Sequence, residues 1–520
     1  MSTTTTAAEP QSRVMRAAFR SFSAIERVGN KLPHPFWLFW MLAIVVIALS
    51  WLLSSLGVSA QAPGSDDVVA AKSLVSQEGV AFMVGEAVTN FATFPPLATI
   101  LVVMLGIAVA ERSGLITSLL HAMVARVPAR YLTFALAMTA MVGHVAGDAA
   151  YVTLIPLGAL VFKAAGRSPA LGAIVAFVSI SAGYDASPSL TTTDVLLSGI
   201  STAAAQTIDE SYVVTPVDNY FFGLASSVLI ALVITVVTEK ILARRPDLET
   251  EDDAADISAD EASLESTPTK RRALRITGLV ALGYVLLLVV AVAPPGSPLR
   301  GEDGGVVSSP LFVGMAFVLG VFFTLLGVVY GAVAGTIRRP REVVEAMVEG
   351  IRSMAPILVL FFAISQFLAY FKWTGLGEIL AIKGAESLRD ISAPGWAVLI
   401  GIAVLVTLMN LVITSGSALW SLAAPVFVPM LMLLDINPET TQAIYRVADS
   451  VTNCVTPMSP YFVMALGFVQ RFRRSAGIGT LASYTIPLAA VIWVVWVLFF
   501  LAWYLVGLPL GPGAPVGALR

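Results

Sequence analysis

Four aspartates lie inside segments that are otherwise apolar, and these side chains are the best candidates for chemistry in this chain. They are Asp148, Asp185, Asp194 and Asp449. An ionisable group at membrane depth costs roughly 2.5 kcal/mol or more unless it is paired or hydrated, so it commonly marks an ion or substrate pathway. For Asp194 and Asp449 we favour such a role over helix capping. For Asp148 and Asp185, capping and function fit the sequence equally well.

Three more side chains accompany these aspartates. Arg446 precedes Asp449 by three residues, so its guanidinium can either pair with that aspartate on one helix face or grip a substrate carboxylate with two hydrogen bonds. His144 is either a proton carrier or a hydrogen-bonded packing residue. Trp420 follows a polar turn and is either an aromatic wall for a ring-bearing substrate or a tryptophan at the lipid interface.

Most of these residues lie in four stretches where Gly, Pro and polar residues interrupt apolar sequence. The stretches are residues 143–148, 181–194, 410–417 and 449–460. Irregular backbone at membrane depth must be buried in protein or line a polar cavity, because lipid cannot satisfy its amide groups. Unwound carbonyls beside carboxylates suit Na⁺, and half-helix N-termini suit substrate carboxylates. The sequence therefore predicts a binding site where the four breaks converge.

The composition indicates that these breaks belong to a membrane protein. The chain has 520 residues, of which 57% are hydrophobic and only 12% charged, and its mean hydropathy is +0.84. Soluble proteins average about 25% charged residues, so this composition excludes a soluble enzyme, a nucleic-acid-binding protein and a disordered chain. The single cysteine, Cys454, excludes an internal disulfide, and with only three histidines a multi-ligand zinc or haem site is not expected.

Apolar runs predict an all-α polytopic membrane protein with nine transmembrane helices and two re-entrant hairpins. The helices are assigned to residues 35–57, 96–110, 169–200, 219–243, 276–294, 310–336, 354–371, 440–468 and 482–507. Of these, 169–200 and 440–468 are broken helices. Residues 131–162 and 394–432 are assigned to hairpins, since only then do the basic clusters that follow the spans lie on one side of the membrane.

The runs form two membrane halves joined by a linker. Residues 1–34 form a basic cytoplasmic arm, 35–243 the first half, 244–275 an acidic cytoplasmic linker, 276–507 the second half and 508–520 a short C-terminal tail. The linker has almost no large apolar residue and is interpreted as a solvated tether. The arm lacks a convincing cleavage site. We therefore expect a multi-pass inner-membrane protein with a cytoplasmic N-terminus and an external C-terminus.

At a constant offset of 269 residues, four Gly or Pro residues of the first half coincide with the same types in the second: Gly147 with Gly416, Pro156 with Pro425, Pro169 with Pro438 and Pro188 with Pro457. Coincidence among helix-breaking residues is the alternative explanation. The loop inside the first copy is basic, with Lys163 and Arg167. Its counterpart carries Asp435 and Glu439, so the two copies are expected to have opposite orientations. An inverted repeat with broken helices is typical of a secondary transporter.

Four stretches resemble the p-aminobenzoyl-glutamate transporter (AbgT) family. They are ITSGSALWSLAAPVFVPML (413–431), YRVADSVTNCVTPMSPYF (445–462), SQFLAYFKWTGLG (365–377) and TDVLLSGIST (193–202). The similarity covers nearly the whole chain, including its basic arm and acidic linker. It implies a homodimer of subunits with nine helices and two hairpins. It also implies transport of aminobenzoyl-glutamate and, in some members, export of sulfonamide antimetabolites driven by an ion gradient.

The resemblance also implies site residues. It assigns substrate binding to Ser417, Trp420, Arg446, Pro438 and Pro457, and cation binding to Asp194, Asp449, Asn410 and Asn453, with Na⁺ at Asp194, Asp449 and Asn453. One departure from the family is Asp185, where an asparagine or a small residue is expected. An additional carboxylate there would change the cation preference or introduce proton coupling. Asp185, Asp148 and His144 are kept as further coupling candidates.

We therefore expect an ion-coupled secondary transporter of aminobenzoyl-glutamate-like aromatic dicarboxylates that works by alternating access, not an enzyme. The expected partners are this substrate or a sulfonamide, the lipid bilayer and a second copy of the chain, without nucleic acid. No cofactor is expected beyond Na⁺ or H⁺ as the coupling ion. An intramembrane amide hydrolase, for which no nucleophile with its base is visible, and an ion channel stay open as alternatives. Import and efflux both stay open, because the direction depends on a coupling stoichiometry that no residue of the sequence indicates.

Overall fold

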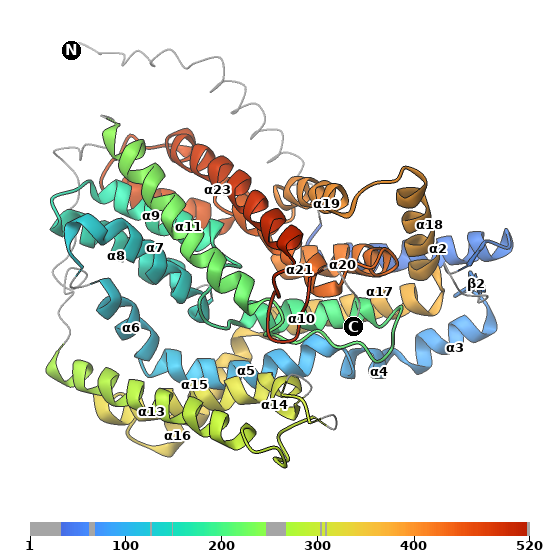
Figure 1. Cartoon of the computed structure of the whole chain (residues 1–520), viewed down its shortest axis with the longest axis horizontal. Coiled ribbons are helices and arrows are strands. Elements are labelled where there is room, and N and C mark those ends of the chain that lie inside the picture. Colours follow the sequence, from blue (N-terminus) through green and yellow to red (C-terminus); the bar gives the residue numbers. More distant parts are fainter. Residues whose placement is uncertain are drawn as a thin grey trace, which may run out of the picture.

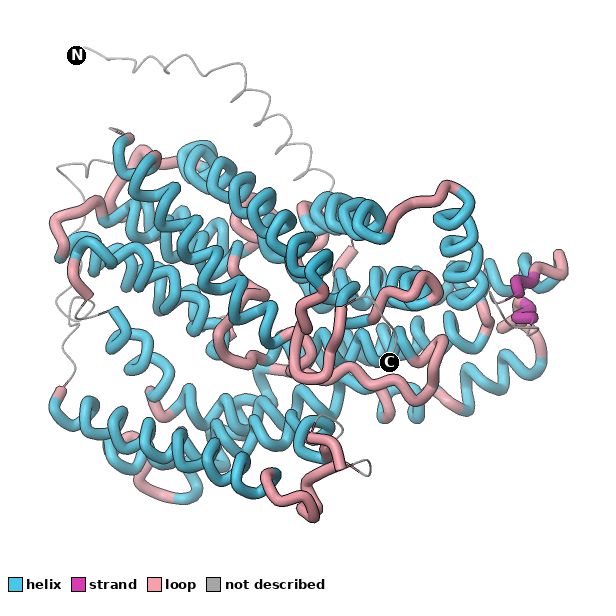
Figure 2. The backbone as a smooth tube through the Cα atoms, in the orientation of Figure 1, coloured by secondary structure: helices cyan, strands magenta, loops and turns pink. Residues whose placement is uncertain are grey.

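The computed structural model describes residues 33–61, 68–124, 127–147, 149–245, 267–301, 304–306 and 309–516. Asp148, nearly all of the basic arm and most of the acidic linker lie outside these ranges, so the predictions made for them stay predictions. The described chain is predominantly helical, as the sequence predicts. Figure 2 shows two short strands at one end, β1 (Ser59–Gln61) and β2 (Val68–Ala70), which pair antiparallel.

Seven of the described helices are long and apolar enough to cross a bilayer. They are α2 (Pro35–Ser55), α5 (Pro95–Arg112), α11 (Tyr220–Lys240), α13 (Pro268–Val292), α15 (Met315–Ala334), α17 (Ala355–Trp373) and α23 (Ile478–Val506). Four of these helices have a proline in their first turn, where the missing N–H costs no intrahelical hydrogen bond. In Figure 1, α13, α15 and α16 lie together along one edge of the molecule, next to α5.

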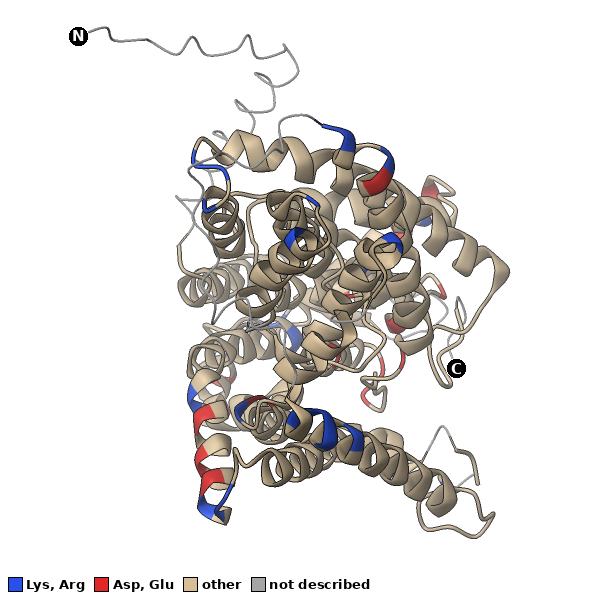
Figure 3. Cartoon of the chain, turned by 90° about the vertical axis from the view of Figure 1, so that its left-hand side faces the viewer, with Lys and Arg blue, Asp and Glu red and all other residues tan. Residues whose placement is uncertain are grey.

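Six further helices and two 3₁₀ turns of the described chain are shorter and lie outside the predicted hairpins and broken helices. They are α3 (Gln77–Gly85), α4 (Ala87–Ala92), α6 (Leu115–Val124), α14 (Pro310–Val313), α16 (Pro340–Ser353), α18 (Leu376–Asp390) and the single 3₁₀ turns η1 (Ala129–Tyr131) and η3 (Leu242–Arg244). In the ribbon of Figure 3, the positions of charged residues are sparse and occur in small groups. α16 carries both signs and pairs them along its exposed side, as between Arg341 and Glu345. This distribution fits a chain whose remaining surface faces lipid.

Each predicted broken helix consists of two shorter helices joined by irregular backbone. The first comprises α9 (Pro169–Ala182) and α10 (Thr192–Ala205), and the second comprises α21 (Pro438–Thr452) and α22 (Pro460–Gln470). They extend a few residues beyond the predicted bounds. Each piece has at most 15 residues, which is too short to cross a bilayer alone. Two composite helices and seven long ones agree with nine spans, although that number stays a prediction.

The predicted hairpins are also pairs of short helices. In the first, α7 (Leu132–Gly143) leads through the 3₁₀ turn η2 (His144–Ala146) into α8 (Ala149–Ala164). In the second, α19 (Gly395–Asn410) and α20 (Gly416–Met432) flank five irregular residues. The first tip turns at Gly147, whose φ of 53° lies in the left-handed region that favours glycine.

Residues related by the 269-residue offset occupy matching places in the fold. Pro156 and Pro425 lie inside the second hairpin helix, Pro169 and Pro438 begin a broken helix, and Pro188 and Pro457 lie in its break. The packing matches as well, because both helices of each hairpin contact the first half of the following broken helix. These correspondences support a repeated structural unit over coincidence among helix-breaking residues.

Small residues set the spacing of the helices. A Cβ on Gly158 of α8 or on Gly172 of α9 would overlap the carbonyl oxygen of the other glycine. The same holds between α5 and α15, where a Cβ on Gly106 would overlap the carbonyl oxygen of Gly320. Membrane helices associate through such close backbone approaches, since lipid offers little hydrophobic driving force between helices. The first hairpin is therefore held directly against the broken helix that follows it.

Replacing Gly172 by leucine is expected to push α8 away from α9 and destabilise the protein. Overpacking of this kind costs about 1–3 kcal/mol, so the Tm of the protein purified in detergent should fall. Gly283→Leu on α13 is the matched control, because no atom lies within 4 Å of a Cβ placed there. Equal Tm values for the two variants would contradict the importance of the α8–α9 contact.

Candidate functional site

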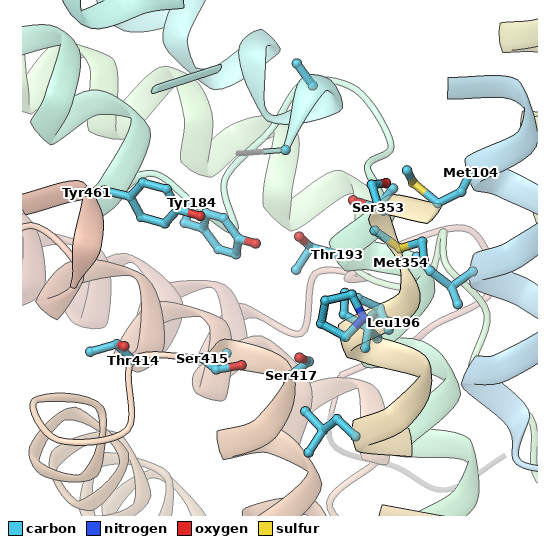
Figure 4. A pocket seen from close by; sticks show the side chains of 18 of the residues that line it. Met104, Tyr184, Thr193, Leu196, Ser353, Met354, Thr414, Ser415, Ser417 and Tyr461 are labelled. Carbon is cyan, nitrogen blue, oxygen red and sulfur yellow. The ribbon is translucent and has the colours of Figure 1, made fainter. Parts of the chain in front are cut away.

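The two hairpin tips and the two helix breaks converge on one cavity of about 580 Å³. The hairpin tips contribute residues 145–147 and 414–417, and the breaks contribute Tyr184, Asn453 and residues 459–461. Figure 4 shows the side chains of Tyr184 and Tyr461 next to each other, on the same side of Thr193 and Ser417. The structure thus brings together all four interruptions that the sequence contains.

Four helices of the hairpins and broken helices begin at or beside this cavity. Thr192, Gly416 and Pro460 are the first residues of α10, α20 and α22, and all three line it. α8 begins two residues after Gly147, which also lines it. The N-terminal end of a helix carries a partial positive charge of about half an elementary charge and unpaired N–H groups. The cavity is therefore suited to anions, although none of the described residues that line it is Lys or Arg.

The opposite wall of the cavity is apolar. It comes from α5 and α17, with Ile100, Met104, Ile107, Met354, Ile357 and Leu360 among its residues. The cavity continues to His34, Glu111 and Ser353, which lie at the start of α2, near the end of α5 and at the approach to α17. The sequence predicts that these three helix ends are cytoplasmic. In that orientation, the cavity extends toward the cytoplasm.

An ion pair joins the two repeats behind this cavity. Arg446 on α21 donates from Nη1 to Oδ1 of Asp194 on α10 at 2.7 Å, and the same nitrogen lies 3.9 Å from Oδ1 of Asp185. All three residues are at least nine-tenths buried. The partner of Arg446 is thus an aspartate of the other repeat, whereas the sequence had suggested its own neighbour Asp449 or a substrate.

Asp194 also caps its own helix. Its Oδ2 accepts hydrogen bonds from the backbone N–H of Thr191 at 2.7 Å and from the Thr191 hydroxyl at 2.8 Å. Together with the bond from the Asp194 N–H to the Thr191 hydroxyl oxygen, this forms a capping box at the start of α10. Both carboxylate oxygens of Asp194 are therefore engaged, one in the helix cap that the sequence offered as an alternative and one in the ion pair, and a cation-binding role stays a prediction.

Asp185 and Asp449 are less well compensated. Asp185 Oδ2 lies 3.2 Å from the Ser450 hydroxyl, and its Oδ1 is buried without a hydrogen-bond partner among the described residues. Asp449 is only 1% exposed, and its Oδ1 likewise lacks a partner there. Its Oδ2 lies close behind the tip of the second hairpin, 2.9 Å from a Cβ placed on Gly416. A glycine at this tip lets the carboxylate approach the cavity wall.

Asn410 ties the second hairpin to the second break. Its Nδ2 donates to the backbone oxygen of Asp449, and also lies 2.7 Å from the Thr452 hydroxyl and 3.0 Å from Asn453 Oδ1. Asn410 Oδ1 is buried without a hydrogen-bond partner in the described chain. Asn453 lines the cavity. Asp449, Asn410 and Asn453 are thus joined by hydrogen bonds, and Oδ1 of Asp449 and Oδ1 of Asn410 each lack a partner in the described chain.

The other predicted site residues lie in different surroundings. Ser417 lines the cavity. Trp420 is fully buried, donates its indole N–H to the Ser201 hydroxyl at 3.0 Å and packs against Tyr445, with ring centroids 4.3 Å apart and ring planes tilted by 34°. It is not among the lining residues, so it supports the wall from behind. Pro438 and Pro457 shape the second broken helix, and neither lines the cavity.

His144 is buried at the first hairpin tip. Its ring forms a T-shaped contact with the ring of Tyr184, with ring centroids 5.4 Å apart. Its Nε2 has no hydrogen-bond partner among the described residues. Asp148 lies outside the described ranges. His144 therefore lies one aromatic ring away from the cavity, in contact with a lining residue.

Sequence reasoning missed the tyrosines of the cavity. Tyr151 of α8 and Tyr461 of α22 stack face to face, with centroids 4.0 Å apart and planes 8° from parallel, and both line the cavity with Tyr184. The repeat offset contains a signal for one of them, because Tyr151 corresponds to Trp420. Tyr184 lies within a predicted break and Tyr461 directly follows one, but the prediction considered only the polar residues there.

Comparison with known proteins agrees with this architecture. The family model described as "AbgT putative transporter family" matches residues 20–518. The p-aminobenzoyl-glutamate transport protein of Escherichia coli (strain K12) is 38% identical over 490 residues, which cover 94% of this chain and 95% of that protein. The crystal structure of the Alcanivorax borkumensis YdaH transporter superposes with a TM-score of 0.87 at 39% identity, covering 92% of this chain and all of that one.

A second solved structure is similar over a still larger part of the chain. Neisseria gonorrhoeae MtrF, whose structure is described as illuminating a class of antimetabolite efflux pumps, superposes with a TM-score of 0.90 at 38% identity. The superposition covers 97% of this chain and all of MtrF. The similarity and the seven apolar helices together indicate a multi-pass membrane transporter, which confirms the resemblance seen in the sequence. The chain belongs to the AbgT transporter family.

Proposed function

We propose that this protein is an ion-coupled secondary transporter of aromatic dicarboxylates of the aminobenzoyl-glutamate type, and that it works by alternating access. The observation that carries the proposal is one cavity on which the N-termini of half-helices from both repeats converge, with under-compensated carboxylates directly behind its wall. Such a cavity pairs an anion site with a cation site. Both are required when one solute moves with an ion.

The substrate carboxylates would bind at the helix N-termini. The first residues of α10 and α20 line the cavity, and the side chains of Thr193, Ser415 and Ser417 lie beside them. Partial helix charges and hydroxyl donors can hold a carboxylate without a lysine or arginine in direct contact. Arg446 would act indirectly, by neutralising Asp194 at the start of α10 so that this carboxylate does not repel the substrate.

The substrate ring would bind against Tyr184 and Tyr461. Both side chains reach the cavity, whereas Trp420, to which the sequence assigned this role, is buried behind the wall. Tyr151 supports Tyr461 by stacking on it. A sulfonamide drug carries a similar aryl ring and would use the same surface. Trp420 would then act through its contacts with Ser201 and Tyr445.

The coupling cation would bind near Asp449. Oδ1 of Asp449 and Oδ1 of Asn410 have no hydrogen-bond partner among the described residues, and Asn410 donates to Asn453, which lines the cavity. An oxygen-rich site of this kind suits Na⁺, and a proton on Asp449 would serve the same purpose. Binding of cation and substrate would be reciprocal, because each lowers the electrostatic cost of the other.

Alternating access requires the cavity to close on one side while it opens on the other. On the predicted external side, Lys372 at the end of α17 donates to the backbone oxygen of Gln206 after α10 at 2.9 Å. The broken helices and hairpins would move against the remaining helices, which would hold two subunits together in the inner membrane. The E. coli relative is named for p-aminobenzoyl-glutamate transport, and the MtrF structure is described as illuminating antimetabolite efflux pumps, which supports both kinds of solute as substrates of this architecture.

Uptake of labelled aminobenzoyl-glutamate into proteoliposomes, under separately imposed Na⁺ and proton gradients, tests the proposal. Asp449→Asn is expected to reduce gradient-driven uptake at least tenfold, because it removes the carboxylate around which the cation binds. Asp209→Asn in the exposed loop after α10 is the control and should transport normally. A flux that does not saturate and does not respond to the Na⁺ or proton gradient would instead indicate a channel. Release of free glutamate would indicate a hydrolase.

Tyr461→Ala should weaken binding of aromatic substrates. The loss of an aromatic pair costs about 0.5–1.5 kcal/mol, which corresponds to a rise of about two- to tenfold in the substrate concentration for half-maximal uptake. Tyr461→Phe keeps the ring and should stay near the wild-type value. An unchanged half-saturation concentration in Tyr461→Ala would place the ring of the substrate elsewhere.

A further inference from the structure

The buried cluster behind the cavity contains more negative than positive charge. One guanidinium, that of Arg446, faces the carboxylates of Asp185, Asp194 and Asp449. The other titratable groups around it are Tyr445, which interacts with Asp449, and Tyr184, which is contacted by His144. None of these three is cationic when His144 is neutral. The cluster of Arg446, Asp185, Asp194 and Asp449 therefore has a net charge of −2 when all three aspartates are ionised.

The geometry shows which aspartates lack compensation. Arg446 is committed to Asp194, at 2.7 Å, and the distance to Asp185 is more than 1 Å longer. Asp194 uses its second oxygen for the capping box. Asp185 and Asp449 each keep one buried oxygen without a hydrogen-bond partner in the described chain. A buried carboxylate in this condition takes up a proton or a cation rather than remain ionised alone.

The surroundings of these two aspartates differ. Asp449 accepts a hydrogen bond from Asn410 through its backbone oxygen, and Asn410 in turn donates to Asn453, so two amide side chains are near enough for their oxygens to contribute to a Na⁺ shell. Asp185 has a single side-chain oxygen partner in the described chain, the Ser450 hydroxyl, and the Arg446 guanidinium lies 3.9 Å away. A metal ion there would have few ligands and a cationic neighbour. A proton needs neither a ligand shell nor extra space.

Asp185 is also close to the aqueous cavity without being required by the repeat. Its neighbour Tyr184 lines the cavity, which gives a proton a short path. The residue at the equivalent place in the second copy is Cys454, which is buried and neutral. The repeated unit therefore folds without a carboxylate at this place, so the fold does not account for Asp185.

We infer that Asp185 is a second coupling site that binds one proton per transport cycle, in addition to the cation at Asp449. Two positive charges would then move with each substrate, and one of them would be a proton whatever ion Asp449 binds. This inference rests on the proposed ion-coupled transport and specifies its stoichiometry. It also assigns the two charges to separate aspartates, one at each break.

The number of coupled ions can be measured in proteoliposomes that contain the full chain, with the membrane potential held at zero by potassium and valinomycin. A gradient of labelled aminobenzoyl-glutamate is imposed, and the opposing Na⁺ and proton gradients that stop net flux are determined. A tenfold substrate gradient is balanced by about a threefold gradient when two cations are coupled, and by about a tenfold gradient when one is. The wild type is expected to give two, including at least one proton.

Asp185→Asn should lower the stoichiometry to one by removing a proton, while Asp185→Glu should keep it at two. Asp209→Asn serves as the carboxylate control and should also give two. Gel filtration and the Tm would show whether each variant is folded. If Asp185→Asn does not fold, the wild-type stoichiometry still tests whether two cations are coupled and whether one of them is a proton.

The inference fails if the wild type couples to a single cation, or if Asp185→Asn keeps the full number of protons. Either result would leave ion-coupled transport itself intact. Flux of the wild type without any dependence on Na⁺ or proton gradients would instead overturn the proposed function. The two failures are therefore distinguishable in one set of measurements.

Discussion

The structure depends on how interrupted helices at membrane depth satisfy their polar groups. Lipid cannot accept their hydrogen bonds, so every break must find partners within the protein. Here the partners come from the opposite repeat: Arg446 of the second broken helix binds Asp194 of the first, and Ser450 contacts Asp185. Because these contacts cross between the repeats, each broken helix is stabilised in its interrupted form by the other. The cavity lies where the two interruptions meet.

Much of this arrangement could be predicted from the sequence, because its signals are local. A run such as 482–507 is long and apolar enough to indicate a spanning helix, and the prolines at the 269-residue offset locate the matching breaks. Ser417 and Asn453, which lie in two of these breaks, both line the cavity. In each case the property that matters, length, apolarity or a helix-breaking residue, belongs to the segment itself.

The pairing of side chains could not be predicted in the same way. Arg446 has a carboxylate three residues away on its own helix, and local spacing gives no reason to prefer Asp194, which is 252 residues distant. Trp420 faces the interior because its indole N–H finds Ser201 of α10. Both outcomes depend on which faces of α10, α20 and α21 meet, and hydrophobic periodicity does not encode that choice for helices that are buried on nearly all sides.

The same cross-repeat contacts suggest why the hairpins and broken helices would not move without bound cation and substrate. If the hairpins and broken helices shift together, the cluster of Asp185, Asp194, Asp449 and Arg446 moves through a region of low dielectric constant. An unloaded cluster would carry uncompensated charge, and desolvating such charge is far more costly than moving a neutral cluster. Cation binding would remove that cost, and a substrate anion at the helix N-termini would be stabilised by the bound cation. Coupling would then follow from the electrostatic cost of moving an incompletely loaded core, without any separate gate that detects occupancy.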